Sequence, residues 1–356
     1  MTWLSDKTIH HLRKVTNLPD LSNTKYKCLQ KVASGGMGTI YVAEDTQLHR
    51  EIALKILDIP DPDGDLADRM QQEAYIIAAL EHPSIVPIHD VGTLPDGRIF
   101  YTMKFVKGRT LADEVKKSTA LPEFLRIFQK LCEGVAFAHS HDVIHRDLKP
   151  ENIMVGDFGE VLVMDWGLAK LLSPGNKSQT LLNKNKTPYS NKSKKQKSGE
   201  LASTLKTGRL TEHGTVMGTP AYMAPEQERG EIDQIDQRTD VYSLGAILKF
   251  LMTSLISDEK SKTSSISLFK NRQRKIPKRL QAISEKAMSE NKSQRYTNVL
   301  DLVTDIENFL NGSPVTAYKE NFLEISWRWL NRYKFLIFLI LVYVFVRLLI
   351  FFLSNL

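Results

Sequence analysis

The sequence predicts an α+β protein in two parts, a smaller strand-rich part followed by a larger, mainly helical part. Two observations carry this prediction. Short apolar or alternating runs, which are typical of strands, dominate up to about residue 106, whereas apolar residues at helical spacing dominate after Gly108. The length of 356 residues, with 42% hydrophobic and 25% charged residues, is typical of a folded chain of about two domains. This composition excludes a wholly disordered chain and a multi-span membrane protein.

The strand signals follow a polar N-terminal extension, residues 1–24, which lacks the apolar core of a secretory signal. Short apolar or alternating runs predict strands at residues 26–33, 39–44, 51–58, 85–91 and 98–106. The first two flank a hairpin turn signal, Ser34-Gly35-Gly36-Met37-Gly38. A helix is predicted before the fourth strand, because one helical face holds Met70, Ala74, Ile77 and Ala78. We expect that helix to stop near His82-Pro83, since proline cannot continue a helix.

Helical periodicity dominates the second part. One predicted helix face is formed by Phe124, Phe128, Leu131 and Val135, and another by Val241, Leu244, Gly245 and Leu248. Two cysteines, Cys28 and Cys132, are too few for a disulfide framework, which indicates a reducing compartment.

The net charge of +7 is local. Residues 173–213 hold eight lysines and one arginine against two glutamates, so this segment accounts for the whole excess. A segment this long and polar is typical of a mobile insert or a regulatory loop. Its lysines either solvate the insert or bind anionic lipid headgroups, and no nucleic-acid partner is expected.

The C-terminal segment, residues 335–353, is apolar except for Arg347. As a helix, its 19 residues would span roughly 28 Å, close to the thickness of a bilayer core. Aromatic and basic residues just before it, from Trp327 to Lys334, resemble a membrane-interface belt. We therefore predict a single transmembrane helix with the preceding domain in the cytoplasm. A buried or interfacial apolar helix is the alternative.

Motifs at characteristic spacing carry the chemistry. Lys55 stands in an apolar strand, where an ammonium group needs an anionic partner, and Glu73 on the following helix could supply it. Farther on come three motifs: His145-Arg146-Asp147-Leu148-Lys149-Pro150-Glu151-Asn152, Asp165-Trp166-Gly167 and Ala224-Pro225-Glu226. In this order the set resembles the eukaryotic-type protein kinase family, from about Tyr26 to Val315. The stretch from Gly218 to Glu226 is most similar to bacterial membrane-anchored serine/threonine kinases.

The resemblance implies a role for each motif residue. Asp147 would accept the proton of the substrate hydroxyl, with Lys149 beside the transferred phosphoryl group and Lys55 on the ATP phosphates, held by Glu73. Asn152 and Asp165 would bind Mg²⁺, with Mn²⁺ as an alternative metal. Met103 would be the gatekeeper at the start of the adenine-binding hinge. The remaining ATP-binding residues would be Val32, Ala33, Ser34, Gly35, Gly36, Met37, Gly38, Ile40, Ala53 and Phe105.

Three features depart from the family pattern. Ala33 replaces the first glycine of the phosphate loop, and we expect this smallest of changes to weaken ATP binding rather than remove it. Trp166 replaces the usual phenylalanine, and this keeps an aromatic residue against His145. Asp157-Phe158-Gly159 matches the metal motif literally, but it lies 10 residues after Asp147, whereas Asp165 lies 18 after it, which is the family spacing. Asp157 is therefore predicted to lie in a hairpin turn.

Other residues have structural or regulatory roles by resemblance. Glu226 would pair with Arg295, and Asp240 would hold the backbone of the catalytic loop. Arg146 is of the kind that receives a phosphorylated activation loop. That activation segment would run from Asp165 to Glu226 and contain the basic insert, residues 173–213. Candidate phosphorylation sites are Ser203, Thr204, Thr207, Thr211 and Thr215, and Thr219 lies at its far end.

Together these features predict a two-lobed protein kinase domain, residues 25–315, with an N-lobe over 25–106 and a C-lobe over 107–315. A juxtamembrane segment (316–334) and the transmembrane helix (335–353) would follow and place the protein in a bacterial inner membrane. The expected activity is transfer of the γ-phosphoryl group of MgATP to serine or threonine hydroxyls of proteins. Self-association would allow autophosphorylation in trans. The alternative is a membrane-anchored pseudokinase scaffold.

Overall fold

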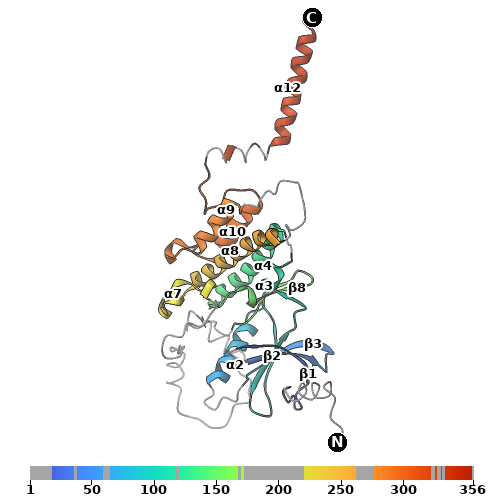
Figure 1. The fold of residues 1–356 in the computed structure, drawn as a ribbon, viewed down its shortest axis with the longest axis vertical. Coiled ribbons are helices and arrows are strands. Elements are labelled where there is room, and N and C mark those ends of the chain that lie inside the picture. Colours follow the sequence, from blue (N-terminus) through green and yellow to red (C-terminus); the bar gives the residue numbers. More distant parts are fainter. Residues whose placement is uncertain are drawn as a thin grey trace.

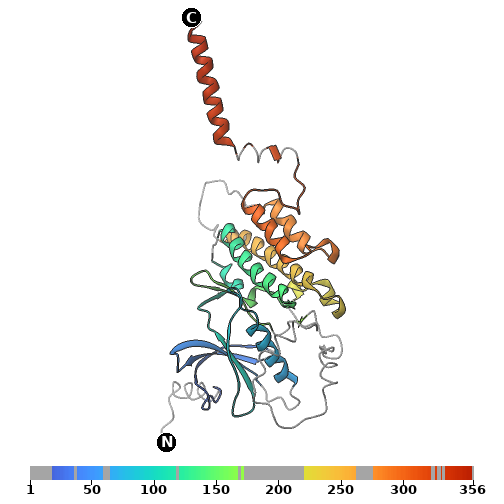
Figure 2. The ribbon, with the colours of Figure 1, turned by 180° about the vertical axis from the view of Figure 1, so that it is seen from behind.

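A computed structural model describes the chain from residue 18 onward, with gaps. The described residues are 18–35, 38–58, 65–117, 120–166, 170–171, 220–261, 276–321, 325–326, 330 and 333–354. A sheet-rich lobe lies near the N-terminus and a helical lobe follows it, and Figures 1 and 2 show the two lobes stacked along the long axis. The predicted two-part α+β architecture is confirmed.

The first lobe is built on a five-stranded antiparallel sheet with strand order β1-β2-β3-β5-β4. Its strands are β1 (Tyr26–Gly35), β2 (Gly38–Asp45), β3 (Arg50–Ile56), β4 (Ile88–Thr93) and β5 (Ile99–Lys104). Helix α2 (Asp65–Ala78) packs against one face, with Met70, Ala74 and Ile77 buried in the main core. The other face has a separate core, which includes Tyr26, Leu54 and Phe100.

The second lobe is mainly helical. Its longer helices are α4 (Leu121–Ser140), α8 (Gln237–Ser261), α9 (Lys278–Ala287) and α10 (Val299–Leu310). The predicted face of α4 is confirmed, because Phe124, Phe128, Leu131 and Val135 are all fully buried. Gly245 lets α8 and α9 approach closely, since a Cβ at this position would lie 2.7 Å from the Cβ of Ala287.

Short elements before and after α4 in the chain include the segments that carry the polar motifs. They are β6 (Gly108–Thr110), α3 (Leu111–Glu114), β7 (Val143–Ile144), η1 (Pro150–Asn152), β8 (Ile153–Gly156), β9 (Val161–Val163) and β10 (Lys170–Leu171). Strands β6, β8 and β9 form one small sheet, and β7 pairs with β10. Three more short helices, η2 (Pro220–Tyr222), α7 (Pro225–Glu228) and η3 (Ile232–Gln234), precede α8, and η4 (Lys292–Gln294) precedes α10.

Two predicted boundaries differ from the structure by three residues or more. The fourth strand was expected at residues 85–91 but begins at Ile88, because Pro87 has no N–H for the ladder, and Ile85 instead forms a parallel bridge with Val163. Helix α2 ends at Ala78 rather than near His82. The amide of Leu80 donates to the carbonyl of Ile77, which is a tighter turn than the α-helix makes.

Helix α12 (Lys334–Ser354) covers the predicted transmembrane segment, and Figures 1 and 2 show it projecting away from both lobes. Many of its apolar side chains are exposed, among them Phe338, Leu341 and Phe345. Judged on the residues that the structure describes, however, no helix is both long and apolar enough to span a membrane. The predicted transmembrane helix is therefore not supported.

Candidate active site

Strand alternation directs Lys55 into the main core. Ile52, Leu54 and Ile56 pack in the core on one face of β3, so Ala53 and Lys55 face the other side, toward α2. There Lys55 Nζ lies 3.0 Å from Glu73 Oε1 and 3.2 Å from Oε2. Lys55 is 6% exposed and Glu73 is 3% exposed. The expected ion pair between these residues is thus present, and it is buried.

Two further groups complete the surroundings of Lys55. Asp165 Oδ1 lies 3.1 Å from its Nζ, and the Tyr101 ring centroid lies 5.5 Å from it. Burial acts to lower the pKa of Lys55, but Tyr101, Glu73 and Asp165 outweigh burial and raise the pKa above its ordinary value. For Asp165, burial acts to raise the pKa, and the charge of Lys55 outweighs it, so the net shift is downward. The site therefore keeps Lys55 protonated and Asp165 ionised at neutral pH.

Tyr101 is the residue that sequence reasoning missed. It lies directly across the ladder from Lys55, and its hydroxyl donates a 2.9 Å hydrogen bond to Glu73 Oε1. The available signal was its position two residues before Met103, which places both on the same face of β5. Without the register between β3 and β5, that signal could not identify Lys55 as its neighbour.

The loop after β7 holds a second polar cluster around Asp147. Lys149 Nζ donates to Asp147 Oδ2 at 2.8 Å. Asn152 Nδ2 donates to the same oxygen at 3.1 Å and to the Asp147 carbonyl at 2.9 Å. These bonds fix the direction of the Asp147 carboxylate, which is partly exposed and able to accept a proton from a bound hydroxyl.

A buried carboxylate on α8 supports this loop from beneath. Asp240 accepts the backbone N–H of His145 and that of Arg146, both at 2.9 Å, and lies 2.7 Å from His139 Nε2. Burial acts to raise the pKa of Asp240, but its hydrogen bonds and the nearby His139 and His145 rings lower it overall. Arg146 has a φ of 71°, a strained left-handed conformation that these contacts hold in place.

Arg146 and Trp166 lie next to the polar clusters around Asp147 and Lys55. The buried Nε of Arg146 makes no hydrogen bond to any described residue, and burial lowers the pKa of the guanidinium. Trp166 is 1% exposed, and its ring centroid lies 4.6 Å from that of His145. Through this contact Trp166 links the segment that carries Asp165 to the loop that carries Asp147.

Most of the described residues expected to bind ATP lie on β1, β2, β3 and β5. Ile40 is the ladder partner of Lys55, and Ala53 is that of Met103. Val32 is 55% exposed on β1. Gly38 has a φ of 139°, and a Cβ there would lie 2.2 Å from the carbonyl oxygen of Ile56, so this position requires glycine. Ala33 and Ser34 pair with Ile40 and Thr39, and Gly35 with Gly38, in the β1–β2 hairpin, and Phe105 follows β5.

The oxygen atoms of Asn152 and Asp165 fit the preference of Mg²⁺ for hard ligands. Asn152 uses its amide nitrogen for the bonds to Asp147, so its amide oxygen is the atom that could bind a cation. Among the described residues, no three His, Cys, Asp or Glu side chains form a metal cluster. Two protein ligands suffice for Mg²⁺, which commonly takes one or two carboxylates together with waters and substrate phosphates.

Glu226 and Arg295 form the expected buried pair. The two guanidinium nitrogens of Arg295 donate to the two carboxylate oxygens of Glu226 at 2.8 and 2.9 Å. Thr239 donates to Glu226 as well, at 2.9 Å. This pair is remote from Lys55 and ties α7 to the segment before α10.

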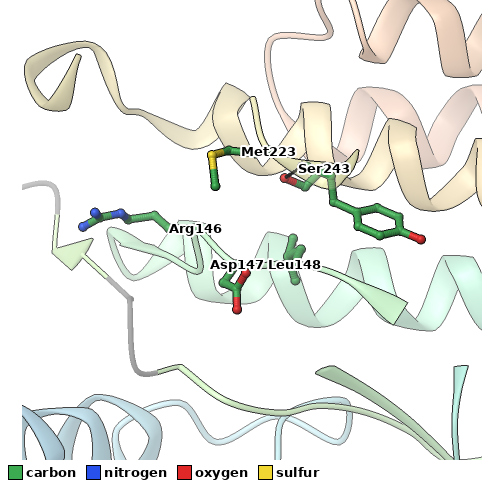
Figure 3. A pocket seen from close by; sticks show the side chains of 6 residues that line it. Arg146, Asp147, Leu148, Met223 and Ser243 are labelled. Atoms are coloured by element: carbon green, nitrogen blue, oxygen red, sulfur yellow. Dashed lines mark hydrogen bonds between the residues drawn. The ribbon is translucent and has the colours of Figure 1, made fainter. Parts of the chain in front are cut away.

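A small pocket opens beside Asp147, between its loop and α8. Figure 3 shows Asp147 and Leu148 on one side and Met223 and Ser243 on the other, with the side chain of Arg146 directed away from Asp147. Ser243 Oγ donates to the carbonyl of Tyr222, which fixes the η2 segment against α8.

The remaining predicted residues divide into two groups. Asp157 lies in the turn between β8 and β9 with Phe158, which is 98% exposed, and Gly159, whose φ is 78°. The predicted hairpin there is confirmed. Outside the described residues lie Gly36, Met37, Gly167, Ser203, Thr204, Thr207, Thr211, Thr215, Thr219 and the whole insert 173–213.

Comparison with known proteins gives consistent matches. The protein kinase domain family matches residues 26–314. The serine/threonine-protein kinase PknD of Protochlamydia amoebophila (strain UWE25) is 34% identical over 328 residues, which cover 83% of this chain and 31% of that protein. PknD of Chlamydia felis (strain Fe/C-56) is 34% identical over 313 residues, which cover 82% of this chain and 31% of that protein. The chain thus spans about a third of the length of these relatives.

Among solved structures, the kinase domain of M. tuberculosis PknI is similar, with a TM-score of 0.52 and 20% sequence identity. The match covers 81% of this chain and 96% of that one. At this level of identity the likeness concerns the fold alone.

Proposed function

Because this chain belongs to the protein kinase family, we propose that it is a serine/threonine protein kinase, which transfers the γ-phosphoryl group of ATP to hydroxyl groups of proteins. The observation that carries the proposal is the buried Lys55, held between Glu73 on α2 and Asp165 after β9. A buried ammonium with two anionic partners is costly to maintain for stability alone. It suits the binding of a polyphosphate, which adds further negative charge at the same place.

In this proposal, each residue of the site contributes to phosphoryl transfer through its position or its charge. Lys55 binds the ATP phosphates while Glu73 keeps it in place. Asn152 and Asp165 hold Mg²⁺, which when bound would neutralise charge on the phosphates during transfer. Asp147 orients the incoming hydroxyl and accepts its proton, and Lys149 lies beside Asp147 to stabilise the negative charge that develops.

Transfer of label from γ-labelled ATP to a mixed serine/threonine protein substrate tests the proposal. The full chain should label serine and threonine in the presence of Mg²⁺, and chelation of the metal should abolish the signal. Lys55→Met should lower labelling by about 100-fold or more, since it removes a charged contact to the phosphates. If the wild-type chain transfers no label with either Mg²⁺ or Mn²⁺, the pseudokinase scaffold is the better account.

We also propose that α12 attaches the kinase to a lipid bilayer. What supports this is the exposure of its apolar side chains and its separation from both lobes, since apolar surface of this extent is unfavourable in water. In a vesicle flotation assay, the full chain should float, and a variant ending at Tyr333 should not. Resistance to an alkaline wash would indicate spanning, and release by the wash would indicate interfacial binding. If both variants stay in solution, the attachment is refuted.

A further inference from the structure

We propose that Tyr101 is a positioning residue for phosphoryl transfer, and that its hydroxyl holds Glu73 in the orientation which keeps Lys55 on the ATP phosphates. The inference rests on the proposed kinase activity. It assigns to Tyr101 a role that the sequence motifs do not contain, because Tyr101 belongs to none of them.

Three elements bring the group together. Lys55 on β3 and Tyr101 on β5 are partners across the ladder, and Glu73 extends from α2 onto the same face of the sheet. All three side chains are nearly inaccessible, at 6%, 2% and 3% exposure. Glu73 Oε1 accepts from Lys55 at 3.0 Å and from Tyr101 at 2.9 Å, so two donors share one carboxylate oxygen. With both bonds in place, the Glu73 side chain is held from two directions.

The second donor matters because Lys55 has competing partners. Lys55 divides its bonds between Glu73 and Asp165. Binding of a polyphosphate adds a third anionic partner and draws the ammonium group toward it. The phenol of Tyr101 is not required by the substrate, so its bond to Glu73 persists through this change. It therefore keeps the carboxylate in place while Lys55 rearranges.

The protonation state of Tyr101 suits this role. Burial raises the pKa of the phenol, and the effect of Glu73 adds to that of burial, whereas Lys55 acts in the opposite direction. The net shift is upward, so the hydroxyl remains a donor throughout the neutral range. A hydrogen bond to a charged acceptor in a dry environment is stronger than one between neutral groups.

A simpler role for Tyr101 is packing, since its ring is part of the main hydrophobic core. The two roles make different predictions for Tyr101→Phe, which keeps the ring and removes only the hydroxyl. If packing is the whole role, this variant keeps wild-type kinetics. If the hydroxyl positions Glu73, kcat/KM for ATP falls by about tenfold, which is the loss expected for one hydrogen bond to a charged group.

Steady-state kinetics of the full chain with varied ATP distinguish these outcomes. The matched control is Tyr26→Phe, because the Tyr26 hydroxyl also bonds to a carboxylate, Asp90 at 2.9 Å, but lies in the other core of the same sheet. We expect this control to stay within about twofold of wild type. Thermal unfolding of each variant shows whether it is folded at the assay temperature. If Tyr101→Phe is unfolded, replacing Tyr101 with 4-methylphenylalanine, which fills the space of the hydroxyl without a donor, decides the question: kcat/KM about tenfold below wild type supports the inference, and wild-type kcat/KM overturns it.

A double-mutant cycle with Glu73→Gln tests whether Tyr101 acts through Glu73. In the Glu73→Gln background, Tyr101→Phe should change kcat/KM by less than about twofold, because the anionic acceptor is already lost. An equal loss in both backgrounds, or wild-type kinetics in folded Tyr101→Phe, would overturn the inference. Inactivity of the wild-type chain itself would instead refute the proposed kinase function, so the two failures are distinguishable.

Discussion

Asp165 and Asp157 have the same residue type and both stand in an Asp-aromatic-Gly triplet, yet their surroundings differ. Asp165 lies 3.1 Å from the buried ammonium of Lys55, whereas Asp157 lies in an exposed turn between β8 and β9. We predict that Asp165→Asn lowers phosphoryl transfer by about 100-fold or more, because it removes the charge of the proposed metal ligand and of a partner of Lys55. Asp157→Asn is the matched control and should keep wild-type activity. Activity lost in the Asp157 variant and kept in the Asp165 variant would reverse the assignment.

Asp240 contributes to stability through its charge. Asp240→Asn should lower the free energy of unfolding by about 3 kcal/mol, since the loop of Asp147 loses a charged acceptor. The exposed Asp233→Asn serves as the control in urea unfolding. No difference between the two variants would contradict the role given to Asp240.

The Asp240 effect should depend on pH in a defined direction. The pKa of this carboxyl is held below its ordinary value of 3.8 in the folded state. Its contribution is therefore complete above the unfolded-state pKa and is lost as the pH falls through the folded-state value. The stability difference between wild type and Asp240→Asn should be constant above about pH 5 and shrink below it. A stability difference between the two proteins that grows as the pH falls would contradict the lowered pKa of Asp240.

At the scale of elements, Glu226 and Arg295 join α7 to the segment before α10. Both side chains are almost wholly buried, so breaking the pair leaves an unpaired charge in the interior. Arg295→Met should lower the free energy of unfolding by about 3–5 kcal/mol, measured in urea. The control is Arg229→Met, which breaks an exposed pair with Glu231 and should cause no measurable change. Similar losses of unfolding free energy in both variants would show that the buried pair contributes no more than the exposed one.

The elements differ in how far the sequence predicts them. The hairpin of β8 and β9 could be predicted because two apolar runs flank a turn signal ending at Gly159. The start of β4 could not, because the apolar run from Ile85 divides its pairing between β9 and β5 on either side of Pro87. Strands β7 and β10 have two residues each, which is too short to show any periodicity.

The sequence likewise predicts some residues of the candidate active site and misses another. Motif spacing identified Lys55, Asp147, Asn152 and Asp165, which the chain brings into two adjoining polar clusters. It missed Tyr101, because the contact of its hydroxyl with Glu73 depends on the register of β3 with β5 and on the placement of α2. Long-range register is a tertiary property that local pattern does not encode.

For the molecule as a whole, the polar clusters, the excess positive charge and the exposed apolar side chains belong to different segments of the chain. The lobes carry the two polar clusters, the excess positive charge belongs to residues 173–213, and α12 exposes apolar side chains beyond the helical lobe. The order of strands before helices was enough to predict the two lobes. The surroundings of α12 were not, because its apolar sequence fits both a lipid bilayer and a protein interior.

The central claim is that Asp147 performs transfer at a site that binds ATP through other residues. Asp147→Asn in the full chain tests it most directly, with nucleotide affinity and transfer rate measured on the same preparation. The account predicts an ATP affinity within about threefold of wild type and a transfer rate lower by about 10²–10⁴-fold, the usual contribution of a general base. Transfer at the wild-type rate by a folded Asp147→Asn chain would contradict it.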